Sequence, residues 1–345
     1  MTARLVDRRP AVPPDRLLAE MVPPRHFVGE SFDTYRPDPA YASQAAALDR
    51  LRTLADQVRA GGSGGGRSWF RRSQPEPVAV YLDGGFGVGK THLLTSLAHA
   101  VGVDVTAYGT FVEYTNLVGA LGFAATVETL ARRRLVCIDE FELDDPGDTV
   151  LMSRLLRELA DRGVALAATS NTLPESLGEG RFAAEDFLRE IQALAARFEV
   201  LRIDGQDYRQ RRTVTQAPEV APEVVARVTA ARADATCDDF ADLLAHLAQV
   251  HPSRYGALLD GVGLVGLTGV APVERQDVAL RLVVLVDRLY DRDVPVVLAG
   301  RGTSELFSAE MLRGGYRKKY YRALSRLGAL AGDGAALVAG PGPTP

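Results

Sequence analysis

A glycine-rich loop that ends in a lysine and a threonine lies near residue 90 of this 345-residue chain. Gly84-Gly85-Phe86-Gly87-Val88-Gly89-Lys90-Thr91 has the spacing G-x-x-x-x-G-K-[ST], in which backbone N–H groups and a lysine surround nucleotide phosphates. Only three of the 40 Lys and Arg residues are lysines, and the other two are the adjacent Lys318 and Lys319. A compact ammonium reaches phosphate oxygens better than the planar arginine fork does. The loop, together with His92, therefore predicts a site for a nucleoside triphosphate.

Two carboxylates follow a short apolar run further along the chain. Leu135-Val136-Cys137-Ile138 precedes Asp139 and Glu140, which predicts a buried strand that ends in two acids. Ligands of open α/β sheets bind at this edge of the strands. We expect Thr91 to ligate Mg²⁺, Asp139 to hold the metal through water, and Glu140 to polarise the attacking water. The alternative is an ordinary solvated acidic turn, which the preceding glycine loop disfavours.

A third polar position follows the next apolar run, 164–168. The sequence Thr169-Ser170-Asn171 comes directly after it, and a polar side chain at the end of a neighbouring strand can orient water against the γ-phosphate. Asn171 is therefore predicted to sense the γ-phosphate, with a simple turn residue as the alternative.

A ring-forming ATPase also needs an arginine at the subunit interface, for which the candidates are Arg181 in GEGRF and its competitors Arg189 and Arg197. For each of these arginines the alternative is a surface ion pair.

The elements that must position these residues follow from hydrophobic patterning. Short apolar runs alternate with amphipathic segments, which predicts a parallel sheet with right-handed crossovers. The expected fold is α/β: a P-loop NTPase core of three layers, with helices on both faces of the sheet, and a smaller C-terminal α/β extension. Strands are expected at 78–82, 105–115, 135–138, 164–168, 198–203, 262–267 and 294–299. Helices are expected at 90–100, 117–133, 149–161, 185–196, 238–250, 275–290 and 316–327.

Composition divides the chain into five segments. Residues 1–25 are rich in Pro and Arg and are expected to be a flexible N-terminus. Residues 26–75 form a helical lead-in with a Gly-rich linker, and residues 76–212 form the P-loop core. Residues 213–331 form the C-terminal extension, beginning with an Ala/Val/Pro-rich connector, and residues 332–345 are expected to be a disordered tail.

Charge and cysteine content narrow the class of protein. The net charge of −4 and the pI near 5.8 give no strong nucleic-acid signal, because dedicated nucleic-acid binders show a basic domain or stripe. Cys137 and Cys237 have no metal-ligand spacing, and a buried reduced thiol is expected at Cys137. No apolar run approaches the roughly 20 residues of a transmembrane helix, and the N-terminus lacks the apolar region of a signal peptide. We therefore expect a cytoplasmic protein without a transmembrane segment.

Taken together, these motifs resemble the AAA+ superfamily and, more narrowly, the ZapE-type ATPases, bacterial cell-division proteins related to a mitochondrial ATPase. The resemblance runs from about Phe27 to Leu330 through FVGESFDTYRPDP, GGFGVGKT, IDEFELDDPGDT, LAATSNTLPESL, RIDGQDYR, LVVLVDRLYDRDVPVVLAG and YRALSRL. Thr172 follows the sensor Asn171, where the family usually has arginine. The family's arginine-finger pattern, Q-R-x-x-F, is matched only loosely, by Gly180-Arg181-Phe182. Thr91-His92-Leu93-Leu94 is closer to replication-initiator ATPases of the DnaA type.

The resemblance implies a Mg²⁺-dependent ATP hydrolase that forms a homo-oligomer when ATP is bound. It also implies a peripheral place at the division site, where such proteins destabilise FtsZ polymers in an ATP-dependent manner. By position, Arg326 in the S-R-L segment would be the sensing arginine of the lid. Three alternatives stay open: a DNA-associated initiator or helicase loader, a protein quality-control ATPase, and a scaffold in which nucleotide is only structural. The lack of a recognisable helix-turn-helix disfavours the first, and Glu140 with Asn171 disfavours the last.

Overall fold

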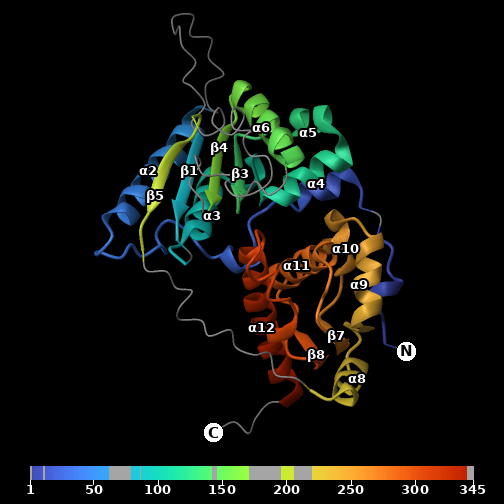
Figure 1. The fold of residues 1–345 in the computed structure, drawn as a ribbon. Coiled ribbons are helices and arrows are strands. Elements are labelled where there is room, and N and C mark those ends of the chain that lie inside the picture. Colours follow the sequence, from blue (N-terminus) through green and yellow to red (C-terminus); the bar gives the residue numbers. More distant parts are fainter. Residues whose placement is uncertain are drawn as a thin grey trace, which may run out of the picture. The chain divides into compact units, whose positions relative to one another are not determined.

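The chain folds into two compact units, shown as a ribbon in Figure 1. The computed structural model describes residues 2–10, 12–61, 79–85, 87–141, 146–170, 196–205 and 220–339. One unit, which we call the core unit, comprises Pro13–Arg211. The other, the C-terminal unit, comprises Arg212–Pro345 together with Met1–Val12. The first twelve residues therefore belong to the unit that the end of the chain forms.

A five-stranded parallel sheet forms the centre of the core unit. Its strands are β1 (Ala79–Gly84), β2 (Thr106–Thr110), β3 (Leu135–Asp139), β4 (Ala165–Ser170) and β5 (Glu199–Ile203). The strand order is β2-β3-β4-β1-β5, so β3, β4 and β1 are consecutive neighbours. Because all five strands run parallel, the residues that follow β1, β3 and β4 gather at one edge of the sheet.

The two faces of this sheet bury alternate residues of each strand. On β1, Val80 and Leu82 pack with α2 (Ala42–Gly61) and α3 (Lys90–Val101). Tyr81, between them, packs on the opposite face with α4 (Phe111–Leu121), α5 (Phe123–Leu130) and α6 (Pro146–Asp161). This alternation is the period of two that a pleated strand imposes. The sequence prediction of an α/β fold with helices on both faces of a parallel sheet is confirmed.

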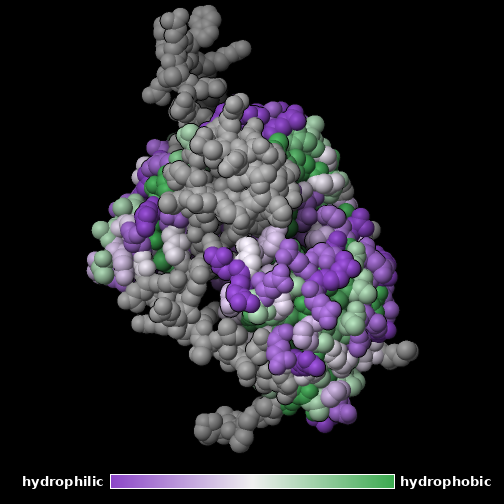
Figure 2. All heavy atoms as spheres, in the orientation of Figure 1, coloured by the Kyte–Doolittle hydropathy of each residue, from purple (hydrophilic) through white to green (hydrophobic). Residues whose placement is uncertain are grey.

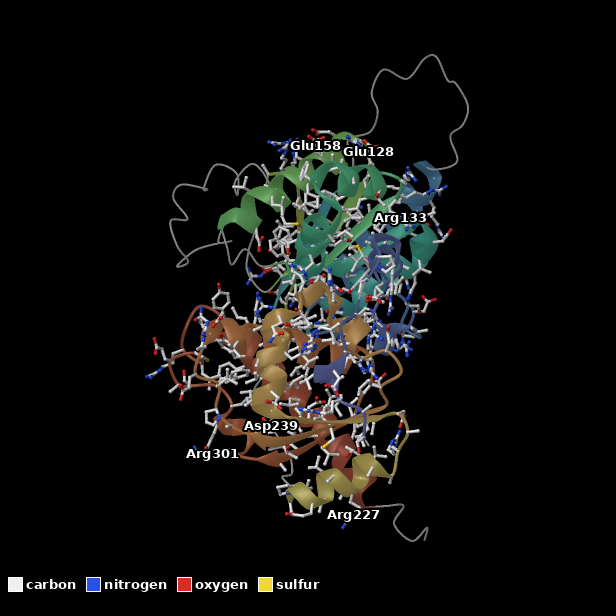
Figure 3. All side chains as sticks on the ribbon, turned by 90° about the vertical axis from the view of Figure 1, so that its right-hand side faces the viewer. Glu128, Arg133, Glu158, Arg227, Asp239 and Arg301 are labelled. Carbon is white, nitrogen blue, oxygen red and sulfur yellow. The ribbon has the colours of Figure 1, made fainter. Side chains whose placement is uncertain are left out.

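Helices α5 and α6 are joined at the surface by one arginine. The guanidinium of Arg162, just after α6, lies 2.7 Å from the Glu128 carboxylate and 3.9 Å from that of Glu158. Figure 3 shows the two glutamates close together on these helices. All three side chains are more than a third exposed, so the pairs add little to stability.

Strand β2 ends at Thr110 and not at Thr115 as predicted, because Thr110 begins helix α4. The N–H of Glu113 donates to Thr110 Oγ1, and the N–H of Thr110 donates to the Glu113 carboxylate at 2.6 Å. This reciprocal pair is a capping box, which satisfies N–H groups that the first helical turn leaves unpaired. The apolar residues after Thr110 belong to the helix and not to the strand.

The C-terminal unit contains a three-stranded parallel sheet in the order β6-β7-β8. Its strands are β6 (Ala235–Asp239), β7 (Leu264–Val270) and β8 (Val296–Gly300). Helix α8 (Pro222–Ala230) packs on one face, and α9 (Phe240–Gln249), α11 (Gln276–Asp291) and α12 (Arg317–Ala339) bury the larger apolar cluster of the unit. The sequence prediction did not identify β6 and α8, because α8 lies in the Ala/Val/Pro-rich segment that was assigned to a connector.

Short elements complete the described residues. They are α1 (Pro14–Ala19) and α10 (Tyr255–Leu258), with 3-10 helices η1 (Leu5–Asp7), η2 (Arg25–Phe27), η3 (Val103–Val105), η6 (Pro252–Arg254) and η7 (Thr303–Glu305).

Both ends of the chain are more ordered than the sequence predicted. Residues 1–25 were expected to be flexible, yet Leu5 is fully buried in the C-terminal unit. The predicted tail 332–345 is helical as far as Ala339, where α12 ends; residues 340–345 lie outside the described part of the chain. A Cβ at Gly334 would lie 2.1 Å from the Val296 carbonyl oxygen. The small residues that suggested disorder therefore let α12 pass close to β8.

An ion-pair cluster joins α11 to α12. The Asp287 carboxylate lies 2.8 Å from Arg322 Nη2 and 2.5 Å from Arg326 Nη1, and the Arg326 guanidinium lies over the Tyr290 ring. Burial alone would raise the pKa of the Asp287 carboxyl, but the two guanidiniums together lower it to about 2. Arg326 thus has partners within its own unit, and its role as a sensing arginine stays a prediction.

Because the folded pKa of Asp287 lies below its unfolded value, this cluster stabilises the protein above pH 4 and loses its effect as pH falls through about 2. We expect Asp287→Asn to lower the free energy of unfolding by about 2 kcal/mol at pH 7. The difference from wild type should shrink between pH 4 and pH 2, as measured by denaturant unfolding. Asp277→Asn, on the same helix but with an exposed partner, is the control and should change stability by less than about 0.5 kcal/mol.

The surface of the described residues mixes polar and apolar groups. On the face shown in Figure 2, hydrophilic side chains predominate and hydrophobic ones lie between them in small groups. The large apolar side chains that are exposed come from several different elements: Val22, Val28, Val103, Val150, Val200, Tyr321 and Leu337. Scattered apolar residues of this kind are normal for a folded protein. Within the described ranges, no helix is both long and apolar enough to cross a membrane.

Candidate nucleotide-binding site

The glycine loop connects β1 to α3, as the sequence predicted. Helix α3 begins at Lys90, and Gly89 before it has φ 91°, a left-handed conformation that favours glycine. Gly84 is needed for a different reason, since a Cβ there would lie 2.3 Å from the Ile203 carbonyl oxygen on β5. Phe86 lies outside the described residues. Gly89 is thus needed for the turn, and Gly84 is needed for the close approach of β5.

Lys90 is held at the mouth of this loop. Its ammonium donates to the carbonyl oxygens of Gly84 at 2.8 Å and Gly85 at 2.5 Å, and the residue is only 9% exposed. Burial raises the pKa of the nearby Asp83 carboxyl, although the charges of Arg202 and Lys90 oppose this effect. The first turn of α3 adds backbone N–H groups and the positive end of the helix dipole. The loop and Lys90 together form a positive, donor-rich site that suits phosphate groups.

Asp139, the last residue of β3, lies at the centre of a hydrogen-bond cluster. Its Oδ1 accepts from the hydroxyls of Thr91 at 3.3 Å and Thr169 at 2.5 Å, and its Oδ2 accepts from the Tyr108 hydroxyl at 2.9 Å. Burial, and then the charge of Asp139, raise the pKa of Tyr108 well above its usual value, so the phenol remains a donor at neutral pH. The carboxylate is therefore fixed in orientation by donors from three other elements.

Glu140 has an unusual backbone conformation, with φ 53°. Its N–H donates to Asp139 Oδ1 at 3.1 Å and to Thr169 Oγ1 at 3.0 Å, and the next N–H, of Phe141, donates to the Thr169 carbonyl at 2.7 Å. Phe141 is then buried against the rings of Tyr81 and Phe111. Left-handed backbone at a residue other than glycine persists only where its surroundings enforce it, and it often marks functional sites. Thr169 and the buried Phe141 enforce it here.

The oxygen atoms of Thr91 and Asp139 fit a magnesium ion. Mg²⁺ prefers hydroxyl and carboxylate oxygens, and it commonly takes one or two of them from a protein and the rest from water and phosphate. The hydroxyl and the carboxylate are 3.3 Å apart, both at the helix end that would receive the phosphates. Among the described residues there is no cluster of three or more His, Cys, Asp or Glu side chains that could hold a metal alone. Thr91 and Asp139 are thus the described residues that could contribute oxygen ligands to a metal at this edge of the sheet.

The lead-in segment packs directly on the glycine loop and on α3. The Tyr35 hydroxyl donates to the Val88 carbonyl at 3.0 Å, and a Cβ on Gly89 would lie 2.5 Å from the Tyr35 ring. His92 Nε2 lies 3.1 Å from both the Ser31 carbonyl and Thr34 Oγ1. Since the Ser31 carbonyl can only accept, the Nε2 of His92 carries the proton. The lead-in therefore supports the loop from outside, and His92 links the two.

The structure brings together four residues that the sequence placed in the site: Lys90, Thr91, Asp139 and Glu140. Asn171 and the interface candidates Arg181 and Arg189 lie outside the described residues. Arg197, the other competitor, pairs with Asp161 at 3.0 Å. Sequence reasoning did not assign roles to Tyr35, Tyr108 and Thr169. A signal existed for Thr169, which directly precedes Ser170-Asn171, and for Tyr35, which lies in the lead-in motif; nothing in the sequence pointed to Tyr108.

We expect Tyr35→Phe to loosen the glycine loop without removing any group that faces the nucleotide. The buried Val88 carbonyl would lose its hydrogen bond, which should lower the free energy of unfolding by about 1 kcal/mol. Denaturant unfolding measures this change. Tyr321→Phe, at a tyrosine that is 50% exposed, is the control and should be neutral. A stable Tyr35→Phe protein would mean that the lead-in does not support the loop.

The chain matches one family model over most of its length. The family model of the AFG1-like ATPases matches residues 11–220 and 213–335. The chain belongs to the AFG1-like ATPase family. The two matched ranges together cover most of the core unit and most of the C-terminal unit.

Curated relatives of this AFG1-like chain include a bacterial cell-division protein. Cell division protein ZapE of Escherichia coli K12 is 31% identical over 166 residues, which cover 44% of each protein. An uncharacterised protein of Schizosaccharomyces pombe is 28% identical over 176 residues, 43% of this chain and 37% of that protein. The chain thus matches less than half the length of these relatives. The ZapE-type resemblance expected from the sequence motifs is confirmed.

Solved structures give a weaker likeness. The DnaC helicase loader aligns with 52% of this AFG1-like chain and 99% of its own, with 19% identity and a TM-score of 0.36. The initiator DnaA bound to AMPPCP and single-stranded DNA aligns with 90% of this chain and 95% of its own, with 10% identity and a TM-score of 0.39. Both TM-scores lie below 0.5.

Proposed function

We propose that this AFG1-like chain is a Mg²⁺-dependent ATP hydrolase that uses turnover to remodel a protein assembly of cell division. The observation that carries the hydrolase assignment is the cluster around Asp139. It links the threonine of the glycine loop, the turn that carries Glu140, and Thr169 at the end of β4. Binding of a nucleotide needs only the loop and Lys90, whereas the added cluster suits a bound metal and an activated water.

In this proposal each residue has a separate task. Lys90 neutralises charge on the β- and γ-phosphates, and Thr91 with Asp139 holds Mg²⁺, which would supply further charge neutralisation when bound. Glu140 orients and polarises the water that attacks the γ-phosphate. Asn171 would contact the γ-phosphate, and Arg181 from a neighbouring subunit would complete the site in an ATP-bound homo-oligomer.

The likeness to Cell division protein ZapE supports the choice of assembly. We propose FtsZ polymers as the substrate, which the chain destabilises while hydrolysing ATP at the cytoplasmic face of the division site. The net charge of −4 and the pI near 5.8 give no strong signal for binding to DNA instead. Membership in the family is also compatible with a wider set of client proteins. The capture experiment described below would identify them.

Phosphate release tests the hydrolase directly. Purified chain should release phosphate from ATP with Mg²⁺ and stop when EDTA removes the metal. Absence of turnover in the presence of Mg²⁺ and FtsZ would contradict the proposal. Light scattering of FtsZ polymers should then fall when chain and ATP are added together, and should not fall with ADP.

A capture experiment tests the partner without assuming it. Glu140→Gln protein, held on ATP, is used as bait in an extract of the cells from which the chain comes. Recovery of FtsZ above the level seen with Lys90→Ala bait supports the division role. Recovery of replication proteins instead, or of diverse unfolded proteins, would replace it with a DNA-associated or a quality-control role.

A further inference from the structure

The first residues of the chain extend the sheet of the C-terminal unit. We call residues 3–9 the N-terminal arm. Ala3 forms a parallel bridge with Thr236, and the N–H of Cys237 donates to the Ala3 carbonyl at 3.0 Å. Strand β6 is the edge strand of the sheet, with β7 on its other side. The arm therefore binds by adding to a sheet edge, a common mode of peptide recognition.

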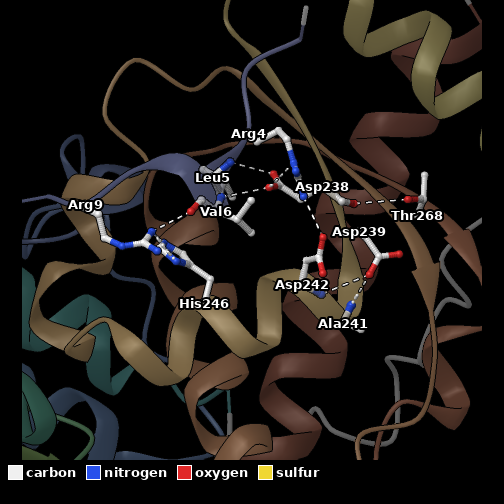
Figure 4. Close-up of polar contacts among 10 residues, drawn as sticks. All are labelled: Arg4, Leu5, Val6, Arg9, Asp238, Asp239, Ala241, Asp242, His246 and Thr268. Atoms are coloured by element: carbon white, nitrogen blue, oxygen red, sulfur yellow. Dashed lines mark hydrogen bonds and ion pairs between the residues drawn. The ribbon is translucent and has the colours of Figure 1, made fainter.

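A buried carboxylate next to this edge accepts two backbone N–H groups of the arm. Asp238 is 1% exposed, and its Oδ2 and Oδ1 accept from the N–H groups of Leu5 at 2.9 Å and Val6 at 3.1 Å (Figure 4). The Arg4 Nε lies 4.0 Å from the same carboxylate. A buried carboxylate needs donors, because desolvation disfavours its charge. The turn at Leu5–Asp7 presents these two N–H groups side by side.

Side chains of the arm fill separate positions around this contact. Leu5 is fully buried and packs into the apolar cluster that includes Phe240 and Leu243. The Arg8 guanidinium donates to the carbonyls of Leu258 at 2.7 Å and Asp260 at 2.8 Å. The C-terminal unit thus binds a buried apolar residue, Leu5, followed three residues later by an arginine, Arg8.

Two further arginines of the arm pair with α9. The Arg4 guanidinium donates to the Asp242 carboxylate at 2.9 Å, and both groups are well exposed. Arg9 Nη1 lies 2.8 Å from Nδ1 of the buried His246. Since a guanidinium can only donate, Nδ1 of His246 is the acceptor. These contacts extend the pattern to Arg-Leu-x-x-Arg-Arg, at positions 4 to 9.

We propose that the edge of β6, with Asp238 and the apolar pocket for Leu5, is a peptide-binding site that the chain's own arm occupies. Its ligands are extended peptides with an apolar residue between arginines, which bind by displacing the arm. A separate peptide can make the same contacts, because they use backbone groups, arginine side chains, the buried Leu5 and the partly buried Val6. The site is separate from the nucleotide loop and does not depend on the proposed function.

Binding of a labelled peptide tests this site in the full-length protein. The probe is a fluorescent peptide with the sequence of Thr2–Arg9, TARLVDRR, and the readout is fluorescence anisotropy. Leu5→Asp protein, whose arm cannot dock, should bind the peptide saturably and at least tenfold more tightly than wild type. The same peptide with aspartate in place of leucine should not bind. Equal binding to both proteins, or no binding to a folded Leu5→Asp protein, would overturn the proposal.

Two further variants keep the test decisive if Leu5→Asp does not fold. Arg8→Ala weakens docking of the arm but leaves Leu5 in its pocket. Because the weaker arm is easier to displace, this variant should bind the unsubstituted peptide more tightly than the wild-type protein does. Asp238→Asn added to Arg8→Ala should weaken peptide binding at least tenfold, because the acceptor for the Leu5 and Val6 N–H groups is lost. Unchanged affinity in that double variant would mean that the peptide does not use this edge.

Discussion

Replacing Lys90 by alanine should lower ATP turnover by a factor of about 100 to 1,000, because phosphate charge in the transition state loses its nearest fixed cation. The side chain is buried at the mouth of the loop, with its ammonium on the Gly84 and Gly85 carbonyls. Phosphate release at saturating ATP and nucleotide affinity by equilibrium binding are both measured, and both should fall.

The chain offers a matched control for this variant. Lys319→Ala removes a half-buried lysine on α12, whose ammonium lies over the Tyr316 ring. Turnover should stay within about twofold of wild type, because this lysine belongs to the C-terminal unit and is not part of the glycine loop. If Lys90→Ala retained wild-type turnover, the glycine loop would not be the site of hydrolysis, whatever its shape suggests.

Glu140→Gln should separate binding from hydrolysis. Glutamine keeps the size of the side chain and the two hydrogen bonds that the residue 140 N–H donates, but it cannot polarise water as a base. We expect turnover to fall by about 100-fold or more, the range for removal of a general base. Nucleotide affinity should remain within about threefold of wild type. Single-turnover phosphate release, started by adding Mg²⁺ to preloaded protein, measures the chemical step alone.

Glu158→Gln is the control for this second variant. Glu158 lies on the exposed side of α6, beside Arg162, and takes no part in the Asp139 cluster. Its substitution should leave both turnover and affinity unchanged. If the Glu140→Gln protein hydrolysed ATP at the wild-type rate, Glu140 would not be the residue that polarises the attacking water, and another carboxylate would have to do so. Loss of affinity instead of turnover would indicate that Glu140 supports the loop structurally.

Most of the candidate site could be predicted from the sequence because the residues within each motif are contiguous. The glycine spacing predicts a loop before a helix, and an apolar run before Asp139 predicts a buried strand. In a parallel sheet these two motifs must meet at one edge, whatever the loops between them do. This is why the pairing of Thr91 with Asp139 could be expected without any structure.

The supporting contacts could not be read in this way. Tyr108 reaches Asp139 from β2, and Tyr35 reaches the loop from a segment more than fifty residues earlier. The residues around a tyrosine in an apolar strand do not indicate its hydrogen-bond partner, because the contact depends on the burial of the side chain and on the register between strands. The left-handed conformation of Glu140 could not be predicted either, because its N–H and that of Phe141 also bind Thr169, which lies on a different strand.

Errors in the fold prediction have local physical causes. The strand predicted to reach Thr115 ends at Thr110, because its capping box with Glu113 outweighs the apolar residues that follow. Alanine and proline near α8 suggested a connector, although a proline in the first turn suits a helix start. Leu5 and its neighbours could not be placed at all, since their partners on β6 and α9 are more than 200 residues away.

The arm has a consequence for how the protein matures on the ribosome. Leu5 and Asp238 are separated by 233 positions, and at roughly 5–20 residues per second the arm waits on the order of 10 to 50 seconds for its site. During that time the core unit can fold, while the arm lacks the Asp238 and Asp242 carboxylates with which it pairs in the folded protein. The C-terminal unit is completed by residues that precede the core unit in the sequence, so it cannot finish folding before β6 has been made.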